Sequence, residues 1–262
     1  MTQTIRFTDG AAYERYMGIW SRLVGEAFLD GLKPAPGLRW LDVGCGNGAF
    51  TSLILERCAP SGVEGIDPSE EQLAFARTRF AASDIPVSFR AGDAQALPYA
   101  EDAFDIAVMP LVIFFLKDPA RGVAEMKRTV RPGGFVTAYA WDMPGQGFPY
   151  AVVTRELKKM GVMVPQTPNP DISEIGALRD LWKAGGLENV EARVITVSRT
   201  FADFEDYWAT VLGAPSAGAI LGGFSAEQRE HLREALRREL PAPAEGSFTL
   251  SARAHAVTGR VA

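Results

Sequence analysis

The chain has 262 residues, a formal net charge of −5, 47% hydrophobic and 23% charged residues, which is the balance of a single globular domain. No apolar run reaches the roughly 18 residues that span a bilayer, and the N-terminus lacks an apolar signal core, so we expect a cytoplasmic protein with no membrane partner. The acidic balance argues against nucleic acid as a partner, and the two cysteines, Cys45 and Cys58, offer no metal cluster.

The first segment, residues 1–37, predicts an N-terminal helical cap. Tyr13, Tyr16 and Trp20 recur at helical spacing, and the segment ends in a linker rich in proline and glycine. Two interpretations stay open for these aromatic side chains. They pack against the sheet, or they cover a cofactor pocket.

A glycine-rich loop organises the chain, because it joins an expected strand at 38–43 to an expected helix at 49–58. Gly44 and Gly46 let the backbone turn sharply and approach a ligand. The free backbone N–H groups at the start of the helix favour a negatively charged group. We interpret Cys45, inside the loop, as a space-filling residue and not as a nucleophile.

The loop alone does not choose its ligand. Gly44, Gly46 and Ala49 fit the dinucleotide pattern G-x-G-x-x-G/A. Asp42, two residues before Gly44, fits a second pattern, Asp-x-Gly-x-Gly-x-Gly. Asp67 ends the next expected strand, 63–67, where its two oxygens can accept both hydroxyls of an adenosine ribose. This ribose occurs in NAD and in S-adenosylmethionine (SAM), so both cofactors remain possible.

The next elements continue a parallel sheet. Short expected strands at 87–90, 104–109 and 135–141 alternate with expected helices at 68–82 and 118–130. The strand at 104–109 is nearly all apolar, as expected for a strand buried on both faces. Ligands of such sheets bind at the carboxyl ends of the strands.

Five motifs in this order resemble the class I SAM-dependent methyltransferases, in particular the ubiquinone/menaquinone C-methyltransferase-like enzymes that act on small molecules. They are Asp42–Gly48, Gly65–Ser69, Gly92–Ala94 with Leu97-Pro98, Phe104-Asp105, and Arg131–Phe135. The resemblance implies an α/β fold: a Rossmann-like, doubly wound, seven-stranded sheet whose last strand is antiparallel.

The resemblance also implies site residues. Gly44 and Gly46 would line the methionine part of SAM, Asp67 would hold the ribose, and Asp93 with Ala94 would bind the adenine. Leu111 would border the sulfonium, and Asp42 would anchor the loop or meet the amino group of SAM through water. The full set expected to bind SAM, or its product S-adenosylhomocysteine (SAH), is Tyr16, Trp20, Asp42, Gly44, Cys45, Gly46, Asp67, Pro68, Gln72, Asp93, Ala94 and Leu111.

The C-terminal half predicts helices at 150–160 and 171–184, a strand at 187–197, helices at 200–212 and 225–240 around a Gly/Ala-rich hinge at 213–223, and a last strand at 248–256. The two strands are too far apart in sequence for a hairpin loop. We therefore expect residues 200–240 to be a helical lid inserted between the last two strands of a single domain, 1–262.

The leading hypothesis is an enzyme that transfers a methyl group from SAM to a small-molecule acceptor, as a monomer or homodimer and without a metal. Catalysis would depend mainly on positioning, since no catalytic base is evident; the polar candidates are Tyr16, Tyr139, Asp142, His231 and His255. The alternatives are a nicotinamide-dependent oxidoreductase and a SAM-binding protein of the same fold without turnover.

Overall fold

A seven-stranded sheet in the order β3-β2-β1-β4-β5-β7-β6 forms the centre of the computed structural model, which describes residues 14–241 and 246–262. The strands are β1 (Arg39–Val43), β2 (Gly62–Asp67), β3 (Val87–Ala91), β4 (Phe104–Pro110), β5 (Val130–Trp141), β6 (Glu188–Phe201) and β7 (Phe248–Arg260). Only β7 runs against its neighbours. The expected doubly wound sheet with an antiparallel last strand is confirmed.

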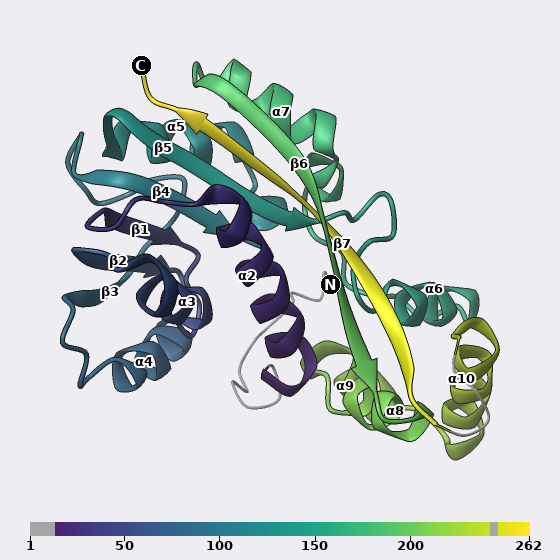
Figure 1. Cartoon of the computed structure of the whole chain (residues 1–262). Helices are drawn as coiled ribbons and strands as arrows, with labels where there is room; N and C mark the ends of the chain where they lie inside the picture. The colour runs from purple at the N-terminus through teal and green to yellow at the C-terminus, as the bar shows by residue number, and fades with distance from the viewer. Residues whose placement is uncertain (1–13, 242–245) are drawn as a thin grey trace.

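Helices cover both faces of the sheet. In Figure 1, α2 (Ile19–Leu32) and α3 (Ala49–Cys58) lie in front of it, whereas α5 (Pro119–Thr129) and α7 (Ile175–Ala184) lie behind it. The remaining helices are α4 (Glu70–Arg79), α6 (Ala151–Lys159), α8 (Phe204–Leu212), α9 (Pro215–Gly222) and α10 (Ala226–Glu239), and a π-helical turn spans Glu14–Gly18. Of the expected N-terminal cap, residues 1–13, Tyr13 among them, lie outside the described residues.

The core is built from the apolar strands and from large aromatic side chains. Almost every residue of β4 is buried, as its sequence predicts. Trp20, Trp40 and Trp182 are fully buried. The Trp182 indole donates a hydrogen bond to the Val136 carbonyl at 2.9 Å, so α7 is fixed against β5.

The last two strands are longer than their sequence predicts. β6 and β7 stay paired from Glu188↔Arg260 to Phe201↔Phe248, where the two Phe rings stack with centroids 5.6 Å apart. The expectation of a helix from residue 200 is therefore wrong at its start, because Thr200 and Phe201 belong to β6 and α8 begins after Asp203, whose side chain caps it.

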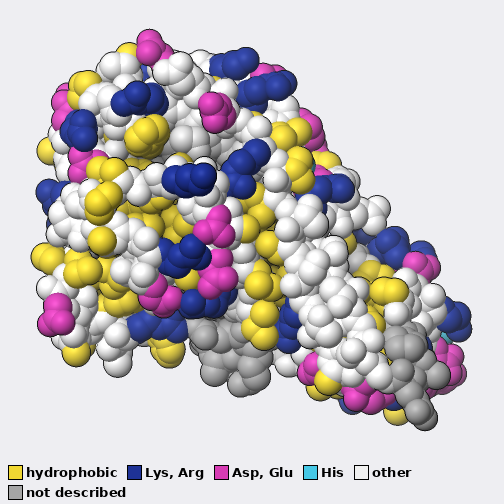
Figure 2. All heavy atoms as spheres, viewed as in Figure 1, with side chains coloured by type: hydrophobic (Ala, Val, Ile, Leu, Met, Phe, Trp, Pro, Cys, Tyr) yellow, Lys and Arg dark blue, Asp and Glu magenta, His cyan; other side chains and the backbone are white. Residues whose placement is uncertain are grey.

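The Gly/Ala-rich stretch at 213–223 is not a hinge. It forms α9, which begins with Pro215 at its first position and ends at Gly222, before the C-cap Gly223. The three helices α8, α9 and α10 lie at the far end of the β6–β7 ribbon (Figure 1). Figure 2 shows this part as a narrow extension of a broader body, with many charged side chains near its end.

β5 also begins earlier than expected. Residues 131–134, which lie between the expected helix and the expected strand, are already part of the strand, because Val130 pairs with Phe104 of β4. The register shifts between Phe104 and Ile106, and Arg131 forms an ion pair with Asp105 at this irregularity. Within the described residues, no helix has the length and apolar character needed to cross a membrane.

Candidate functional site

Two cavities adjoin at the carboxyl ends of the parallel strands. The first, of about 780 Å³, is lined by the glycine-rich loop and by the ends of β2, β3 and β4; we name it the glycine-loop cavity. The second, of about 810 Å³, is lined by Phe114, Trp141, Phe148 and residues of α6; we name it the aromatic cavity. Leu111 and Phe115 line both, so they mark the junction.

The backbone of the loop explains why glycines stand in it. Gly44 has φ +77°, and a Cβ there would lie 2.4 Å from Val112 Cγ2. Gly46 has φ +51°, but a Cβ there would meet nothing within 4 Å, since this residue faces the glycine-loop cavity. A ligand can therefore approach the backbone of Gly46 closely.

Asp67, at the end of β2, holds this loop in place. Its Oδ2 accepts the Gly46 N–H at 3.0 Å and its Oδ1 accepts the Ser69 N–H at 2.9 Å. Burial raises the pKa of Asp67, although these two hydrogen bonds oppose the shift. Each oxygen has a further lone pair, so the carboxylate can still accept ligand hydroxyls from the cavity that it lines.

Asp42 lies beneath the loop and is fully buried. Its Oδ2 accepts a hydrogen bond from the Thr51 hydroxyl at 2.7 Å, but its Oδ1 has no partner in the described structure, and neither has Asn47 Nδ2. Burial raises the pKa of Asp42 to about 7. A buried acceptor and a buried donor without hydrogen-bond partners near the same loop indicate a place for a polar ligand group or a water.

Asp93 follows β3 and remains exposed at the edge of the glycine-loop cavity. Its Oδ1 accepts the backbone N–H of Gln95 at 2.8 Å, and the Gln95 side-chain amide donates to the same carboxylate. These hydrogen bonds lower the pKa of Asp93, so the group is an ionised acceptor at neutral pH.

Leu111 has an unusual backbone for a residue with a branched side chain. Its φ is +59°, and its N–H donates to the Tyr139 carbonyl at 2.7 Å. Non-glycine residues in this left-handed region are uncommon and are often found at functional sites. Here the strained residue stands where the two cavities meet.

The structure brings most of the predicted cofactor residues together. The glycine-loop cavity is lined by Gly44, Cys45, Gly46, Asp67, Pro68, Gln72, Asp93, Ala94 and Leu111. Three others lie elsewhere: Tyr16 lines the aromatic cavity, Asp42 lies beneath the loop, and Trp20 lies in the core. Trp20 is fully buried because its side of α2 packs inward, so this side chain does not line the glycine-loop cavity.

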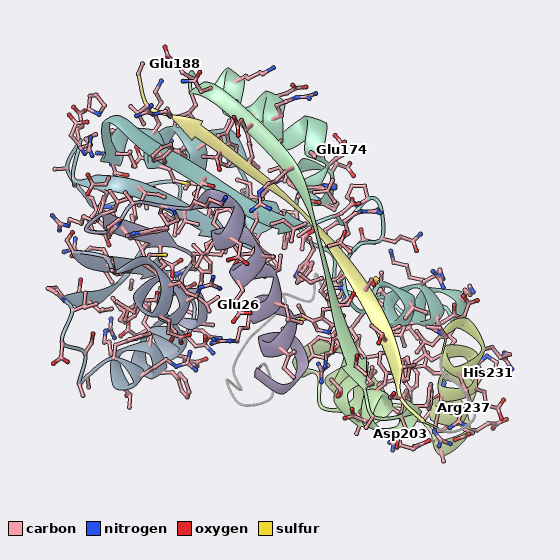
Figure 3. The ribbon with its side chains drawn as sticks, in the orientation of Figure 1. Glu26, Glu174, Glu188, Asp203, His231 and Arg237 are labelled. Atoms are coloured by element: carbon pink, nitrogen blue, oxygen red, sulfur yellow. The ribbon has the colours of Figure 1, made fainter. Side chains whose placement is uncertain are left out.

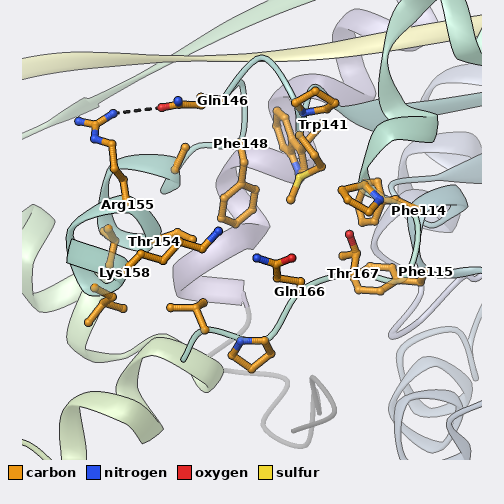
Figure 4. Close-up of a pocket in the computed structure, with 18 of the residues that line it drawn as sticks. Phe114, Phe115, Trp141, Gln146, Phe148, Thr154, Arg155, Lys158, Gln166 and Thr167 are labelled. Atoms are coloured by element: carbon orange, nitrogen blue, oxygen red, sulfur yellow. Dashed lines mark hydrogen bonds between the residues drawn. The ribbon is translucent and has the colours of Figure 1, made fainter. Parts of the chain in front are cut away.

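The aromatic cavity has two unlike sides. Figure 4 shows Phe114, Phe115 and Trp141 on one side, and Thr154, Arg155 and Lys158 of α6 on the other. The polar residues of this cavity were not predicted from the sequence; among them are Thr154, Lys158, Gln166 and Thr167. They come from a helix and a loop with no motif, and only the fold brings them to one place.

None of the polar candidates is an evident base. His231 is exposed on α10 and points away from the body of the molecule (Figure 3). His255 is buried; its Nδ1 donates to the Ser173 carbonyl at 2.8 Å, and its Nε2 lies 3.8 Å from Asp142 Oδ2. Neither histidine lines either cavity.

The remaining candidates have structural partners. Asp142 accepts a hydrogen bond from Arg253 Nε at 2.8 Å, away from both cavity walls. Tyr16 stacks on Tyr150 with centroids 4.0 Å apart, and burial raises the pKa of Tyr16 well above its usual range. Tyr139 lines the glycine-loop cavity. The described residues also contain no group of three or more His, Cys, Asp or Glu that could hold a metal ion.

Comparison with known proteins shows what the part of the chain around the glycine-rich loop is similar to. The family model "Methyltransferase domain" matches residues 41–138. The ubiquinone biosynthesis O-methyltransferase of Rhizobium etli (strain CIAT 652) is 36% identical over 104 residues, which cover 40% of this chain and 41% of that relative. The matched part thus spans about two fifths of the curated relatives.

Two solved structures share the fold across most of this chain. The YcgJ protein of Bacillus subtilis has a TM-score of 0.61 at 15% identity, covering 90% of this chain and 97% of that one. Phosphoethanolamine N-methyltransferase 2 of Haemonchus contortus, solved with S-adenosyl-L-methionine, has a TM-score of 0.61 at 19% identity, covering 96% of this chain and 56% of that one.

Proposed function

We propose that this chain, whose residues 41–138 match the methyltransferase model, is a class I SAM-dependent methyltransferase and transfers a methyl group from SAM to a small-molecule acceptor in the aromatic cavity. The junction of the two cavities at Leu111 and Phe115 carries this proposal. A donor in one cavity and an acceptor in the other would meet there, as a direct transfer requires.

The residues of the glycine-loop cavity fit SAM. Gly46 leaves its backbone open to the methionine part, Asp67 offers acceptors for the ribose hydroxyls, and Asp93 with Ala94 stands where the adenine would bind. The unpartnered Asn47 Nδ2, on a residue that lines the cavity, can donate to the carboxylate end of SAM, and the buried Asp42 Oδ1 can reach its amino group through a water.

When bound, SAM supplies an electrophilic methyl group on its sulfonium. The chain's own contribution is to hold the acceptor atom in line with that group and to exclude water. Such positioning can lower a barrier by about 7–11 kcal/mol at best. Because neither described histidine lines a cavity, we propose that no histidine base takes part, and that the acceptor atom attacks without one.

The helices α8, α9 and α10, within the expected segment 200–240, fit a lid over the acceptor. Ile220 of α9 lines the aromatic cavity. Glu239 of α10 pairs with Arg155 and Lys159 of α6, at 2.7 Å and 3.7 Å, which links the segment to the cavity wall. On the cofactor side, Gly18, Ser21 and Arg22 line the glycine-loop cavity, so the N-terminal segment contributes a cover there.

Isothermal titration with SAH and, separately, with NAD tests the proposal. We expect micromolar binding of SAH and none of NAD. Asp67→Asn and Asp93→Asn should each weaken SAH binding by about 10- to 100-fold, the effect of losing a hydrogen bond to a charged group. Asp84→Asn is the matched control, because this exposed aspartate lines neither cavity.

The outcomes separate the alternatives. Binding of NAD but not of SAH would contradict the proposed methyl transfer and support a nicotinamide-dependent oxidoreductase. Binding of SAH that is unchanged in both aspartate variants would remove the proposed cofactor site. Binding of SAH with no transfer to any acceptor in a broad screen would leave a SAM-binding protein without turnover.

A further inference from the structure

The far wall of the aromatic cavity carries charge. Arg155, Lys158 and Lys159 of α6 all line the cavity, and the one acidic side chain in its lining is Asp171. Opposite them are the aromatic rings next to the junction (Figure 4). The cavity is therefore apolar where the transferred methyl group would stand and positively charged at its other end.

Two of the three basic groups already have acidic partners. Arg155 NH2 lies 2.7 Å from Glu239 Oε2, and Lys159 Nζ lies 2.7 Å from Glu156 Oε1. For the exposed Lys158, by contrast, no carboxylate of residues 14–241 and 246–262 lies within ion-pair distance of the ammonium. Its charge is thus available to a ligand.

Polar groups continue toward the aromatic side. Thr167 Oγ1 is buried and has no hydrogen-bond partner in the described structure, although the residue lines the cavity. In Figure 4 Gln166 and Thr167 lie between the basic wall and the rings of Phe114 and Phe115. A buried hydroxyl without a partner is costly unless a ligand or water completes it. This points to an acceptor with polar groups along an apolar body.

Resting on the proposed function, we infer that the acceptor carries an anionic oxygen group, such as a carboxylate, sulfonate or phosphate, which pairs with the Lys158 ammonium. The apolar body then lies against Phe148 and Trp141, and the atom to be methylated lies near Leu111. The opposite choice, a cationic acceptor held by Asp171, would appear as the absence of a preference for an anionic probe.

Two probes that differ by one anionic group test this inference. They are 8-anilinonaphthalene-1-sulfonate and its neutral analogue N-phenyl-1-naphthylamine, whose fluorescence rises in apolar cavities. Each probe is titrated into the full chain with and without saturating SAH. Probe bound in the glycine-loop cavity would be displaced by SAH, whereas probe in the aromatic cavity would remain bound. We expect the sulfonate to bind at least about tenfold more tightly than the neutral probe, as a charge-assisted contact gives.

Three variants locate the effect. Lys158→Met keeps the apolar stem and should abolish the preference for the sulfonate, while binding of the neutral probe stays unchanged. Lys183→Met is the matched control, an exposed lysine in the last turn of α7 that lines neither cavity, and should behave as the wild type. Phe148→Ala should weaken both probes alike.

A wild type without preference for the sulfonate, or a Lys158→Met variant that retains it, would overturn the inference. Phe148→Ala binding both probes as the wild type does would also overturn it, since the probes would then lie elsewhere. The proposed function has its own readout, the SAH titration. If SAH fails to bind while Lys158→Met still abolishes the preference for the sulfonate, the result contradicts the proposed methyl transfer but supports an anion-binding site at Lys158.

Discussion

At the scale of single residues, burial sets the chemistry of the site more than sequence spacing does. Asp42 and Asp67 are both acidic residues of the motifs, yet one is sealed beneath the loop and the other lines the cavity. The sequence assigns both to the cofactor. Only the structure separates a carboxylate that can touch a ligand from one that supports the loop through Thr51.

Asp42 should make stability depend on pH. Its folded-state pKa, about 7, lies above the value near 3.9 of an unfolded chain. Between these values the folded protein retains a proton that the unfolded chain releases, so the free energy of unfolding falls as pH rises from about 4 to about 7 and then levels off. The shift corresponds to a loss of about 4 kcal/mol.

Asp42→Asn removes this titration and keeps an oxygen for the Thr51 hydroxyl. Urea unfolding at a series of pH values should show a flatter profile for the variant than for the wild type between pH 5 and 7. Equal slopes in the two proteins would show that Asp42 is already ionised in the folded state across this range.

At the scale of elements, the strand–loop–helix unit around β1 and α3 was predictable, because its signals are local. Gly44 and Gly46 stand at fixed positions between an apolar strand and a helix, and Ser225 with Gln228, three residues apart, forms a capping box at the start of α10. These patterns depend on neighbours within a few residues, which the sequence displays directly.

Elements whose form depends on distant partners were not predictable. β6 continues to Phe201 because Phe248, far along the chain, stacks against it. The stretch that forms α9 contains glycines that favour a hinge when taken alone. The aromatic cavity collects Lys158, Thr167 and Trp141 from three segments, none of which carries a motif, so the acceptor side of the site could not be derived from spacing.

The glycine loop offers a test with an internal control. Gly46→Ala places a Cβ in the open cavity and should weaken SAH binding more than tenfold. Gly37→Ala puts a Cβ in equally open space at φ +80° but outside both cavities. Both changes should cost about 1–2 kcal/mol of stability from the left-handed backbone. Equal SAH affinity in the two variants, measured by calorimetry, would exclude close ligand approach at Gly46.

At the scale of the whole molecule, the sheet brings two cavities of different character to one edge. Residues 41–138, which the methyltransferase model matches, supply most of the glycine-loop cavity and the junction. The C-terminal half supplies most of the aromatic cavity, including the basic residues of α6 and Ile220 of α9. We therefore expect cofactor binding to depend on the first part and acceptor choice on the second.

The most direct measurement is isotope-edited NMR of the protein bound to SAM labelled with ¹³C in its transferable methyl group. We predict nuclear Overhauser contacts from that methyl to the side chains of Leu111 and Phe115, the two residues that line both cavities. Leu111→Met, which adds no branch at Cβ to this left-handed residue, should shift the first contact and assign it. A bound methyl group with contacts to neither residue would contradict the proposed meeting of donor and acceptor at this junction.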